Sequence, residues 1–502
     1  MRKDFSDIRR YSLFLLASLV TCALAITDQS LWIDEGNTAA KAIQASLSAW
    51  WTTFVSAKGS DLQMPGYMLF EWGWAKIFGS SEIALRASNI PLFVAGIWAL
   101  AWGMSSHRKR QTAVVFLALT NAFLWYYLSE ARPYIVLFCF ASLTAACLFR
   151  LLHATEDALD SKSWFRLFCL GLFGLCLTSL IAVPWALGAM VAALYWSGPR
   201  ALTRSILRFK GAFSLLIGAL AILGWYYLWT MKIGARASGV GRTGWSSVAF
   251  IFYELFGLAG LGPGRLQLRA EGGGGLVPFV PFVALGGGAV LVLVLTGFRV
   301  LRQKTEKRHV VFFLCAVASP LLLTLAAGVS GQMRLLGRHL TPLLPYLLAL
   351  MAVGLTTFLE THSPWKKVVG WAAVVVFLLS ALEIRFAPRH RRDDYRSAAE
   401  IAREARDAGE IVWWLADQST GLYYGVPLNS PLIIDSPDLP RPARTPDLVI
   451  LSKPDVYDWS GAVRAYLAQN NFTVERVLPA FQIWRPTPPR LPVVKSPGKA
   501  GE

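Results

Sequence analysis

Long apolar stretches recur along this chain and constrain its fold more than any other feature. Several contain about 17 to 23 residues, enough for a helix to cross the roughly 30 Å hydrocarbon core of a bilayer. Core helices of water-soluble domains need shorter apolar runs. We therefore predict a polytopic α-helical membrane protein with about eleven spans, at residues 11–27, 83–104, 111–129, 134–152, 166–183, 185–197, 212–231, 276–298, 310–328, 343–359 and 368–386.

The composition agrees with a protein that crosses a bilayer many times. Charged residues make up 16% of the 502 residues, against roughly 25% in an average soluble domain, and 55% are hydrophobic. The formal net charge is +18 and there are 20 tryptophans. We expect membrane lipids as partners, and no nucleic acid.

The charges of the short loops predict how the chain is oriented. "SHRKRQ", "GPRALTRSILRFK", "FRVLRQKTEKRH" and "SPWKK" carry Lys and Arg, which favours the cytoplasmic side for them and for the N-terminus. Eleven spans of the plasma (inner) membrane then leave the C-terminus in the extracytoplasmic or periplasmic space. The first stretch contains Ala23-Leu24-Ala25, which resembles a signal-peptide cleavage site. We prefer an uncleaved helix, because the topology closes only if this helix stays.

Two further regions differ from the spans. "KAIQASLSAWWTTFVSA" and "PGYMLFEWGWAKIFG", in the first external loop (27–82), are too short or too polar to span and carry tryptophans that favour the headgroup level. We predict interfacial helices there. From "DDYRSAAEIAREARDAGEIVWW" onward, helix and strand patterns alternate, which predicts a small α/β domain. We divide the chain into a transmembrane domain (1–386), an extracytoplasmic α/β domain (387–486) and a disordered tail (487–502).

Arginines in the predicted external loops break the positive-inside pattern. Any single one can simply face water, but Arg132 in "SEARPY" and Arg338 in "GRHLTPLLPY" each lie close to a span and a proline. A guanidinium that is half withdrawn from water needs an anionic partner, and its planar fork suits a phosphate. We therefore predict an anionic lipid headgroup at the outer face, with bulk phospholipid as the alternative. The external arginines are Arg132, Arg236, Arg242, Arg265, Arg269, Arg334 and Arg338.

An adjacent acid pair, Asp34 and Glu35, follows the first apolar stretch. A carboxylate near a bound phosphate can accept the proton of an attacking hydroxyl, which is worth roughly 10² to 10⁴ in rate. Adjacent side chains point in different directions, so we assign the base to Asp34 and an orienting or acceptor-serving role to Glu35. The alternative is an acid pair that stabilises the N-terminus of the following helix.

Four motifs occur together in an order that resembles one family. They are Asp34-Glu35, "DLQMPGYMLFEWGWAKIFGSSEIALR", "YYLSEARPY" and "GRHLTPLLPYLLAL". Over roughly residues 10 to 350 the chain resembles the GT-C membrane glycosyltransferases related to bacterial protein O-mannosyltransferases, the lipid A aminoarabinose transferase and lipopolysaccharide galacturonosyltransferases. "DDYRSAAEIAREARDAGEIVWW" resembles their external C-terminal domain.

The resemblance implies a polyprenyl-phosphate sugar donor and a catalytic aspartate in the first external loop, here Asp34. It matches Glu130 and Arg132 to the "EAR" motif and Arg338 to the late arginine before "LLP". The implied function is that of an inverting glycosyltransferase of the outer membrane face, acting on a glycan, lipid or protein acceptor. Arg132 and Arg338, with Arg334, would hold the donor phosphate.

One part of the resemblance is imperfect. Asp61 stands before Pro65-Gly66-Tyr67, and Asp61 and Tyr67 are candidates for the donor or acceptor site. The family usually has a His or Lys and a double proline here, whereas this chain has Gln63 and Met64 before a single proline. This departure leaves open which cation stands at that point, and hence which sugar is transferred.

Other functions make different demands on the sequence. A transporter or flippase of a polyprenyl-linked or polysaccharide substrate should have its key acid within a span, usually with a repeated half, and neither is evident. A non-catalytic scaffold leaves the loop arginines unexplained. The cysteines and histidines have no metal-ligand spacing, so we predict no cofactor and leave dependence on a divalent metal undecided.

Overall fold

The computed structural model describes residues 2–153, 162–233, 243–303, 306–330 and 334–487. They form two compact units, one of Met1–Asp28 with Lys41–Arg391 and one of Gln29–Ala40 with Arg392–Glu502. From residue 488 onward, the predicted disordered tail lies outside the described residues. Arg236 and Arg242 do so as well.

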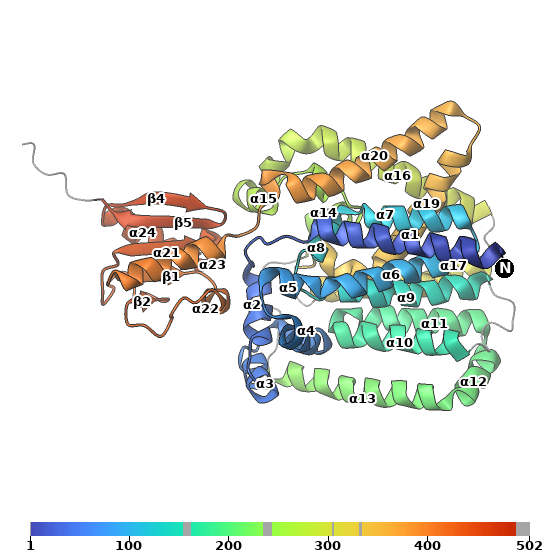
Figure 1. The fold of residues 1–502 in the computed structure, drawn as a ribbon, viewed down its shortest axis with the longest axis horizontal. Helices are drawn as coiled ribbons and strands as arrows, with labels where there is room; N and C mark the ends of the chain where they lie inside the picture. Colours follow the sequence, from blue (N-terminus) through green and yellow to red (C-terminus); the bar gives the residue numbers. More distant parts are fainter. Residues whose placement is uncertain (1, 154–161, 234–242, 304–305, 331–333, 488–502) are drawn as a thin grey trace, which may run out of the picture. The chain divides into compact units, whose positions relative to one another are not determined.

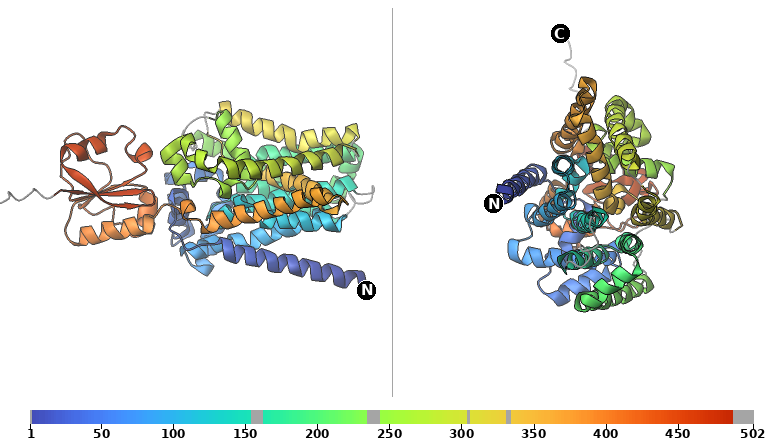
Figure 2. Two further views of the ribbon diagram at one scale, coloured as in Figure 1. Left: turned by 90° about the horizontal axis from the view of Figure 1, so that it is seen from above. Right: turned by 90° about the vertical axis from the view of Figure 1, so that its right-hand side faces the viewer.

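The first unit is helical (Figures 1 and 2). Its elements are α1 (Arg2–Ala25), α3 (Leu47–Ser56), η1 (Ser60–Gln63), α4 (Pro65–Phe78), α5 (Glu82–Ala87), α6 (Asn89–Gly103), α7 (Arg108–Leu119), α8 (Ala122–Leu128), α9 (Tyr134–His153), α10 (Lys162–Thr178), η3 (Leu180–Ala182), α11 (Val183–Ser197), α12 (Pro199–Arg208), α13 (Lys210–Lys232), α14 (Trp245–Leu255), η4 (Ala259–Leu261), α15 (Arg265–Glu271), η5 (Gly272–Phe279), α16 (Val280–Gln303), α17 (Lys307–Phe313), η6 (Leu314–Ala318), α18 (Ser319–Ser330), η7 (Gly337–Leu343), α19 (Leu344–Glu360), α20 (Pro364–Phe386) and η8 (Pro388–His390).

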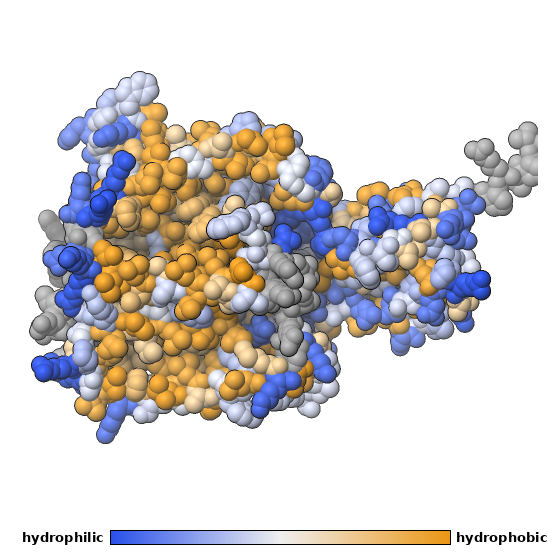
Figure 3. Space-filling model, turned by 180° about the vertical axis from the view of Figure 1, so that it is seen from behind, coloured by the Kyte–Doolittle hydropathy of each residue, from blue (hydrophilic) through white to orange (hydrophobic). Residues whose placement is uncertain are grey.

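The polytopic helical class predicted from the sequence is confirmed, with fewer full-length spans. Within the described residues, 9 helical segments are long and apolar enough to cross a bilayer, or 10 if a pair bent by 54°, Arg108–Leu119 with Ala122–Leu128, counts as one. The difference is the predicted span 166–183, whose apolar helix ends at Thr178 and is shorter than the nine segments. Figure 3 shows apolar side chains forming a broad band over one face of this unit.

Neighbouring spans pack closely where a glycine of one helix meets the backbone of the other. A Cβ added at Gly297 of α16 would lie 2.2 Å from the backbone oxygen of Leu350 on α19. On α19, a Cβ at Gly354 would lie 2.0 Å from the oxygen of Leu293. Glycine is therefore required on both helices for their backbones to approach, as is common between helices in a membrane.

The second unit is a small α/β domain joined by an early piece of the chain. Its elements are α2 (Ile33–Ala42, of which Ile33 to Ala40 belong to this unit), α21 (Tyr395–Asp407), β1 (Val412–Leu415), α22 (Gln418–Tyr423), β2 (Ile433–Ile434), β3 (Leu448–Ser452), α23 (Pro454–Tyr457), α24 (Ala462–Gln469), β4 (Phe472–Leu478) and β5 (Phe481–Pro486).

The five strands form one mixed sheet in the order β2-β1-β3-β5-β4. β1 is parallel to β2 and β3, whereas β5 is antiparallel to β3 and β4. Successive strand residues point to opposite faces, so Trp414 packs with α21 and Trp413 packs with α24. Each face of the central strands is thus covered by one helix, and the predicted C-terminal helix–strand alternation is confirmed.

Candidate functional site

Asp61 of η1 pairs with two buried cations in the helical unit. Its Oδ2 atom accepts from Lys41 Nζ at 2.8 Å, and its Oδ1 atom accepts from Arg132 Nη1 at 2.9 Å. The three residues are at most 7% exposed. Burial alone would raise the pKa of the Asp61 carboxyl, but the charges of Arg132 and Lys41 outweigh burial and lower the pKa to about 2. Asp61 is therefore ionised at neutral pH, and it holds both cations in place.

Local contacts fix the backbone on which this cluster stands. η1 is held by tyrosines of α13, since Tyr226 Oη donates to the oxygen of Leu62 at 2.8 Å. Arg132 lies in the short turn between α8 and α9. The buried side-chain amide of Asn89 donates to three backbone oxygens of α8 and this turn, including that of Glu130 at 2.8 Å. Asn89 thus helps to hold the turn just ahead of Arg132.

Arg338 belongs to the same neighbourhood as Arg132. It stands in η7, with its guanidinium carbon 5.6 Å from the ring centre of Tyr134. The ring of His339 lies close enough to both Arg338 and Arg132 to experience their charges. Its Nδ1 atom accepts from the Leu336 amide at 3.1 Å, so this ring is held by the backbone. Two arginines that are distant in sequence therefore both lie near one histidine.

A buried carboxylate ties η7 to the α14–α15 region. Glu254 Oε2 accepts from the Gly337 amide at 2.9 Å, and Glu254 Oε1 pairs with Arg265 at 2.7 Å. Arg265 also donates to the hydroxyl of Tyr127 at 2.8 Å. Because Gly337 precedes Arg338, Glu254 fixes the backbone that presents this arginine.

The other predicted residues of the helical unit differ in burial. Glu130 is 0% exposed and Tyr67, on α4, is 1% exposed. Glu130 lies near Tyr127 and Arg265, since its charge acts on both of them. Arg334, in contrast, is exposed ahead of η7. Asp61, Glu130 and Tyr67 are thus interior groups, whereas Arg334 faces the surface.

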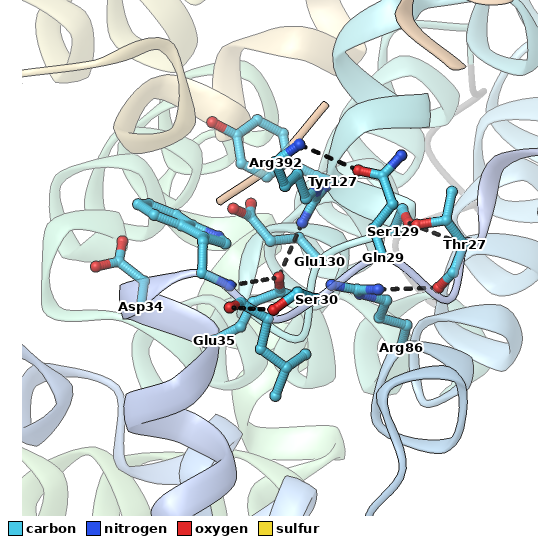
Figure 4. A network of polar contacts seen from close by, with 12 residues as sticks. Thr27, Gln29, Ser30, Asp34, Glu35, Arg86, Tyr127, Ser129, Glu130 and Arg392 are labelled. Carbon is cyan, nitrogen blue, oxygen red and sulfur yellow. Dashed lines mark hydrogen bonds and ion pairs between the residues drawn. The ribbon is translucent and has the colours of Figure 1, made fainter. Parts of the chain in front are cut away.

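Asp34 and Glu35 lie in the first turn of α2 and belong to the second unit. Glu35 is 0% exposed, and its Oε2 atom pairs with Arg392 Nη1 at 3.0 Å (Figure 4). Asp34 is half-buried, and its charge acts on Asp417. The two acids therefore have different surroundings, as their adjacency in a helix requires.

Sequence reasoning did not assign a role to Lys41, Glu254 or Arg265 in the site. Lys41 supplies a cation beside Asp61. The family resemblance leads one to expect a His or Lys close to Asp61, where this chain has Gln63 and Met64. One signal for Lys41 was present, because it stands among small residues (Ala39, Ala40 and Ala42) that permit close packing. Within the described residues no three His, Cys, Asp or Glu side chains gather as a metal site would need.

Comparisons with known proteins concern the fold. No family model matches the sequence, and no curated protein sequence matches it either. The crystal structure of ArnT from Cupriavidus metallidurans in the apo state is similar over 95% of this chain and 98% of that chain, with a TM-score of 0.53 and 12% identity. The crystal structure of that ArnT bound to undecaprenyl phosphate matches over 94% and 97%, with a TM-score of 0.52 and 13% identity. The predicted resemblance to a GT-C membrane glycosyltransferase is therefore confirmed for the fold.

Proposed function

We propose that this chain, which has the fold of ArnT, is an inverting glycosyltransferase with a polyprenyl-phosphate sugar as its donor. The acceptor is a hydroxyl of a glycan, lipid or protein at the extracytoplasmic face of the membrane. Two facts support the donor class: a protein of the same fold has been crystallised with undecaprenyl phosphate, and the helical unit has a membrane-spanning architecture in which a long prenyl chain can lie.

The proximity of both Arg132 and Arg338 to His339 is the observation that carries the proposal. Arginine forks match phosphate oxygens in pairs, and they act strongly where water is scarce. Arg132 is 3% exposed. Cations placed there in advance stabilise the charge that develops on the phosphate as the sugar leaves, which is often the largest catalytic effect.

Asp61 and Lys41 complete this proposed phosphate site. The Asp61 carboxylate has a pKa of about 2, so it stays ionised and keeps Lys41 and Arg132 oriented before the donor arrives. Preorganised groups lose less entropy when the ligand binds. Glu130 and Tyr67 are proposed as neighbouring donor- or acceptor-site groups, and Arg334 as an outer contact of the phosphate.

Asp34 is the proposed base. Its carboxylate takes the proton of the acceptor hydroxyl, the acceptor oxygen forms a bond to the anomeric carbon, and the bond from that carbon to the phosphate oxygen breaks. The electron pair leaves with the prenyl phosphate, and attack from the opposite side inverts the anomeric configuration. Base catalysis contributes roughly 10² to 10⁴ in rate.

Two measurements on the purified protein test this function. Mass spectrometry of co-purified lipid should find a prenyl-phosphate sugar, which identifies the donor. The rate of transfer to an acceptor should fall by roughly 10²- to 10⁴-fold in Asp34→Asn, with donor binding retained. Donor binding should weaken in Arg132→Ala and Arg338→Ala and stay unchanged in Arg108→Ala, an exposed arginine on α7. Wild-type transfer by Asp34→Asn would refute the mechanism, and movement of labelled lipid across liposomes without sugar transfer would favour a transporter.

A further inference from the structure

The segment that carries Asp34 folds as part of the C-terminal unit. Gln29–Ala40 groups with Arg392–Glu502, although hundreds of residues separate them in sequence. The centre of the attachment is the ion pair of Glu35 with Arg392, at 3.0 Å. Gln29 Oε1 also accepts from the backbone amide of Arg392 at 3.2 Å (Figure 4). Gln29 and Glu35, which lie on either side of Asp34 in the sequence, are therefore both held by Arg392 of the C-terminal unit.

Further contacts attach the chain just ahead of Asp34. The hydroxyl of Tyr424 accepts from the Leu31 amide at 2.7 Å, and Ser30 Oγ accepts from the Arg396 amide at 3.0 Å. Ile33 packs against the core between α21 and the sheet. These contacts involve backbone groups, so they fix the path of the chain and the direction in which α2 begins.

The side of α2 beyond Asp34 is fixed by close packing. A Cβ at Gly36 would lie 1.9 Å from Thr420 Oγ1 and 2.5 Å from Thr420 Cβ, so only glycine fits against α22. Thr420 is in turn held by Asp417, whose Oδ2 atom accepts from the Thr420 amide at 2.8 Å. Thr420, near the start of α22, therefore limits how closely α2 can approach α22. This steric contact does not depend on the ion pair of Glu35 with Arg392.

The burial of the ion pair indicates its role. The Glu35 side chain is 0% exposed and that of Arg392 is 7% exposed. Replacing such a pair by apolar groups often leaves stability unchanged, so a buried pair is better understood as a device for fixing one geometry. Because the Glu35 carboxylate is engaged by Arg392, it is suited to holding α2.

We propose that Arg392, acting through Glu35, is a positioning residue for Asp34, so that the C-terminal unit is part of the catalytic apparatus. This inference rests on the proposed function, in which Asp34 is the base. Glu35 and Arg392 touch neither the donor nor the acceptor in this proposal. They hold the first turn of α2 so that the Asp34 carboxylate points at the acceptor hydroxyl.

The test uses the full-length protein and the Arg392→Ala variant. We expect kcat to fall by about a factor of 100, as a misplacement of about 1 Å can cause, with the donor KM unchanged. Hydrogen exchange of the α2 amides should rise while exchange in α13 stays as in the wild type. Arg403→Ala, an exposed arginine of α21, is the matched control and should change neither quantity.

A double-variant comparison separates positioning from a general structural role. In the Asp34→Asn background, Arg392→Ala should lower the residual rate by less than twofold, because there is no longer a base to position. Equal losses in both backgrounds would overturn the inference. The exchanged pair Glu35→Arg with Arg392→Glu should recover most of kcat, since it restores the ion pair.

A steric pair provides evidence that does not depend on charge. Gly36→Ala should lower kcat, and Thr420→Gly in the same chain should recover it. Thr420→Ala should not recover it, because the Cβ atom remains.

The failure of this inference is distinguishable from that of the proposed function. Wild-type transfer by Asp34→Asn overturns both. An inactive Asp34→Asn together with a wild-type kcat in Arg392→Ala overturns the positioning role alone.

Discussion

Replacing Asp61 with asparagine removes the carboxylate that pairs with two buried cations, and we expect a large loss of stability. Removing one member of a buried ion pair typically costs about 3–5 kcal/mol, because charge is left in the interior without its partner. The pKa of Asp61 supports a similar scale. A fall from 3.8 to about 2 corresponds to about 2 kcal/mol in favour of the ionised form.

The effect should depend on pH in a defined direction. Because the pKa is lowered in the folded protein, the stabilisation is fully present above about pH 4 and is lost as the pH falls towards 2. Thermal unfolding in detergent, followed by tryptophan fluorescence, should therefore show a difference in unfolding free energy between wild type and Asp61→Asn that narrows by about 2 kcal/mol from pH 5 to pH 2.

Asp7 provides the matched control for this experiment. It also faces two arginines, Arg10 at 3.4 Å and Arg108 at 3.6 Å, but its side chain is 52% exposed. Asp7→Asn should cost only about 0–1 kcal/mol at neutral pH. Adding Lys41→Met to Asp61→Asn should recover part of the loss, because it removes one buried charge. If Asp61→Asn costs no more than Asp7→Asn, the cluster does not stabilise the fold as argued.

Three other substitutions test the surrounding framework. Asn89→Ala should cost about 1–3 kcal/mol in the same unfolding assay, because it removes three hydrogen bonds to backbone oxygens. Gly264→Ala should prevent accumulation of folded protein, since its Cβ would lie 1.6 Å from the oxygen of Arg389, whereas Gly211→Ala, with no atom within 4 Å of the Cβ, should be tolerated. Arg338→Lys should raise the donor KM less than Arg338→Ala does, because lysine keeps the charge but loses the bidentate geometry; a wild-type KM in Arg338→Lys would refute phosphate binding through a guanidinium fork.

The spans could be predicted because membrane insertion is decided by local composition. A run of apolar residues such as Pro364–Phe386 satisfies all of its backbone groups within one helix, so its length and hydropathy are sufficient evidence. The segment 166–183 was overestimated for the same reason. Its hydropathy continues past Thr178, where the helix ends and a short 3₁₀ turn, Leu180–Ala182, begins.

The composition of the polar cluster was harder to predict. Arg132 and Arg338 were identified because each stands beside a span, where a charge is unusual. Lys41 gave no such signal, since a lysine at the end of an interfacial helix ordinarily reaches water. Its burial follows from the position of Asp61, twenty residues later in the chain, and only the folded structure brings the two together.

A segment belongs to a compact unit because its residues contact that unit, and such contacts cannot be read from local composition. For this reason the sequence did not reveal that Gln29–Ala40 groups with the C-terminal unit. The predicted loop from 27 to 82 is a single connection between two spans, yet Gln29–Ala40 groups with the C-terminal α/β domain and Lys41 with the helical unit. The boundary falls within α2, which carries Asp34 in its first turn and Lys41 in its last. Glu35 and Arg392 stand 357 positions apart, and neither residue is unusual in its own surroundings. The burial of the pair arises only when both partners meet, because an isolated charge would not leave water. A short helix can therefore join a domain formed much later in the chain although nothing in its own sequence indicates this. In this chain that helix is α2, which carries the proposed base Asp34.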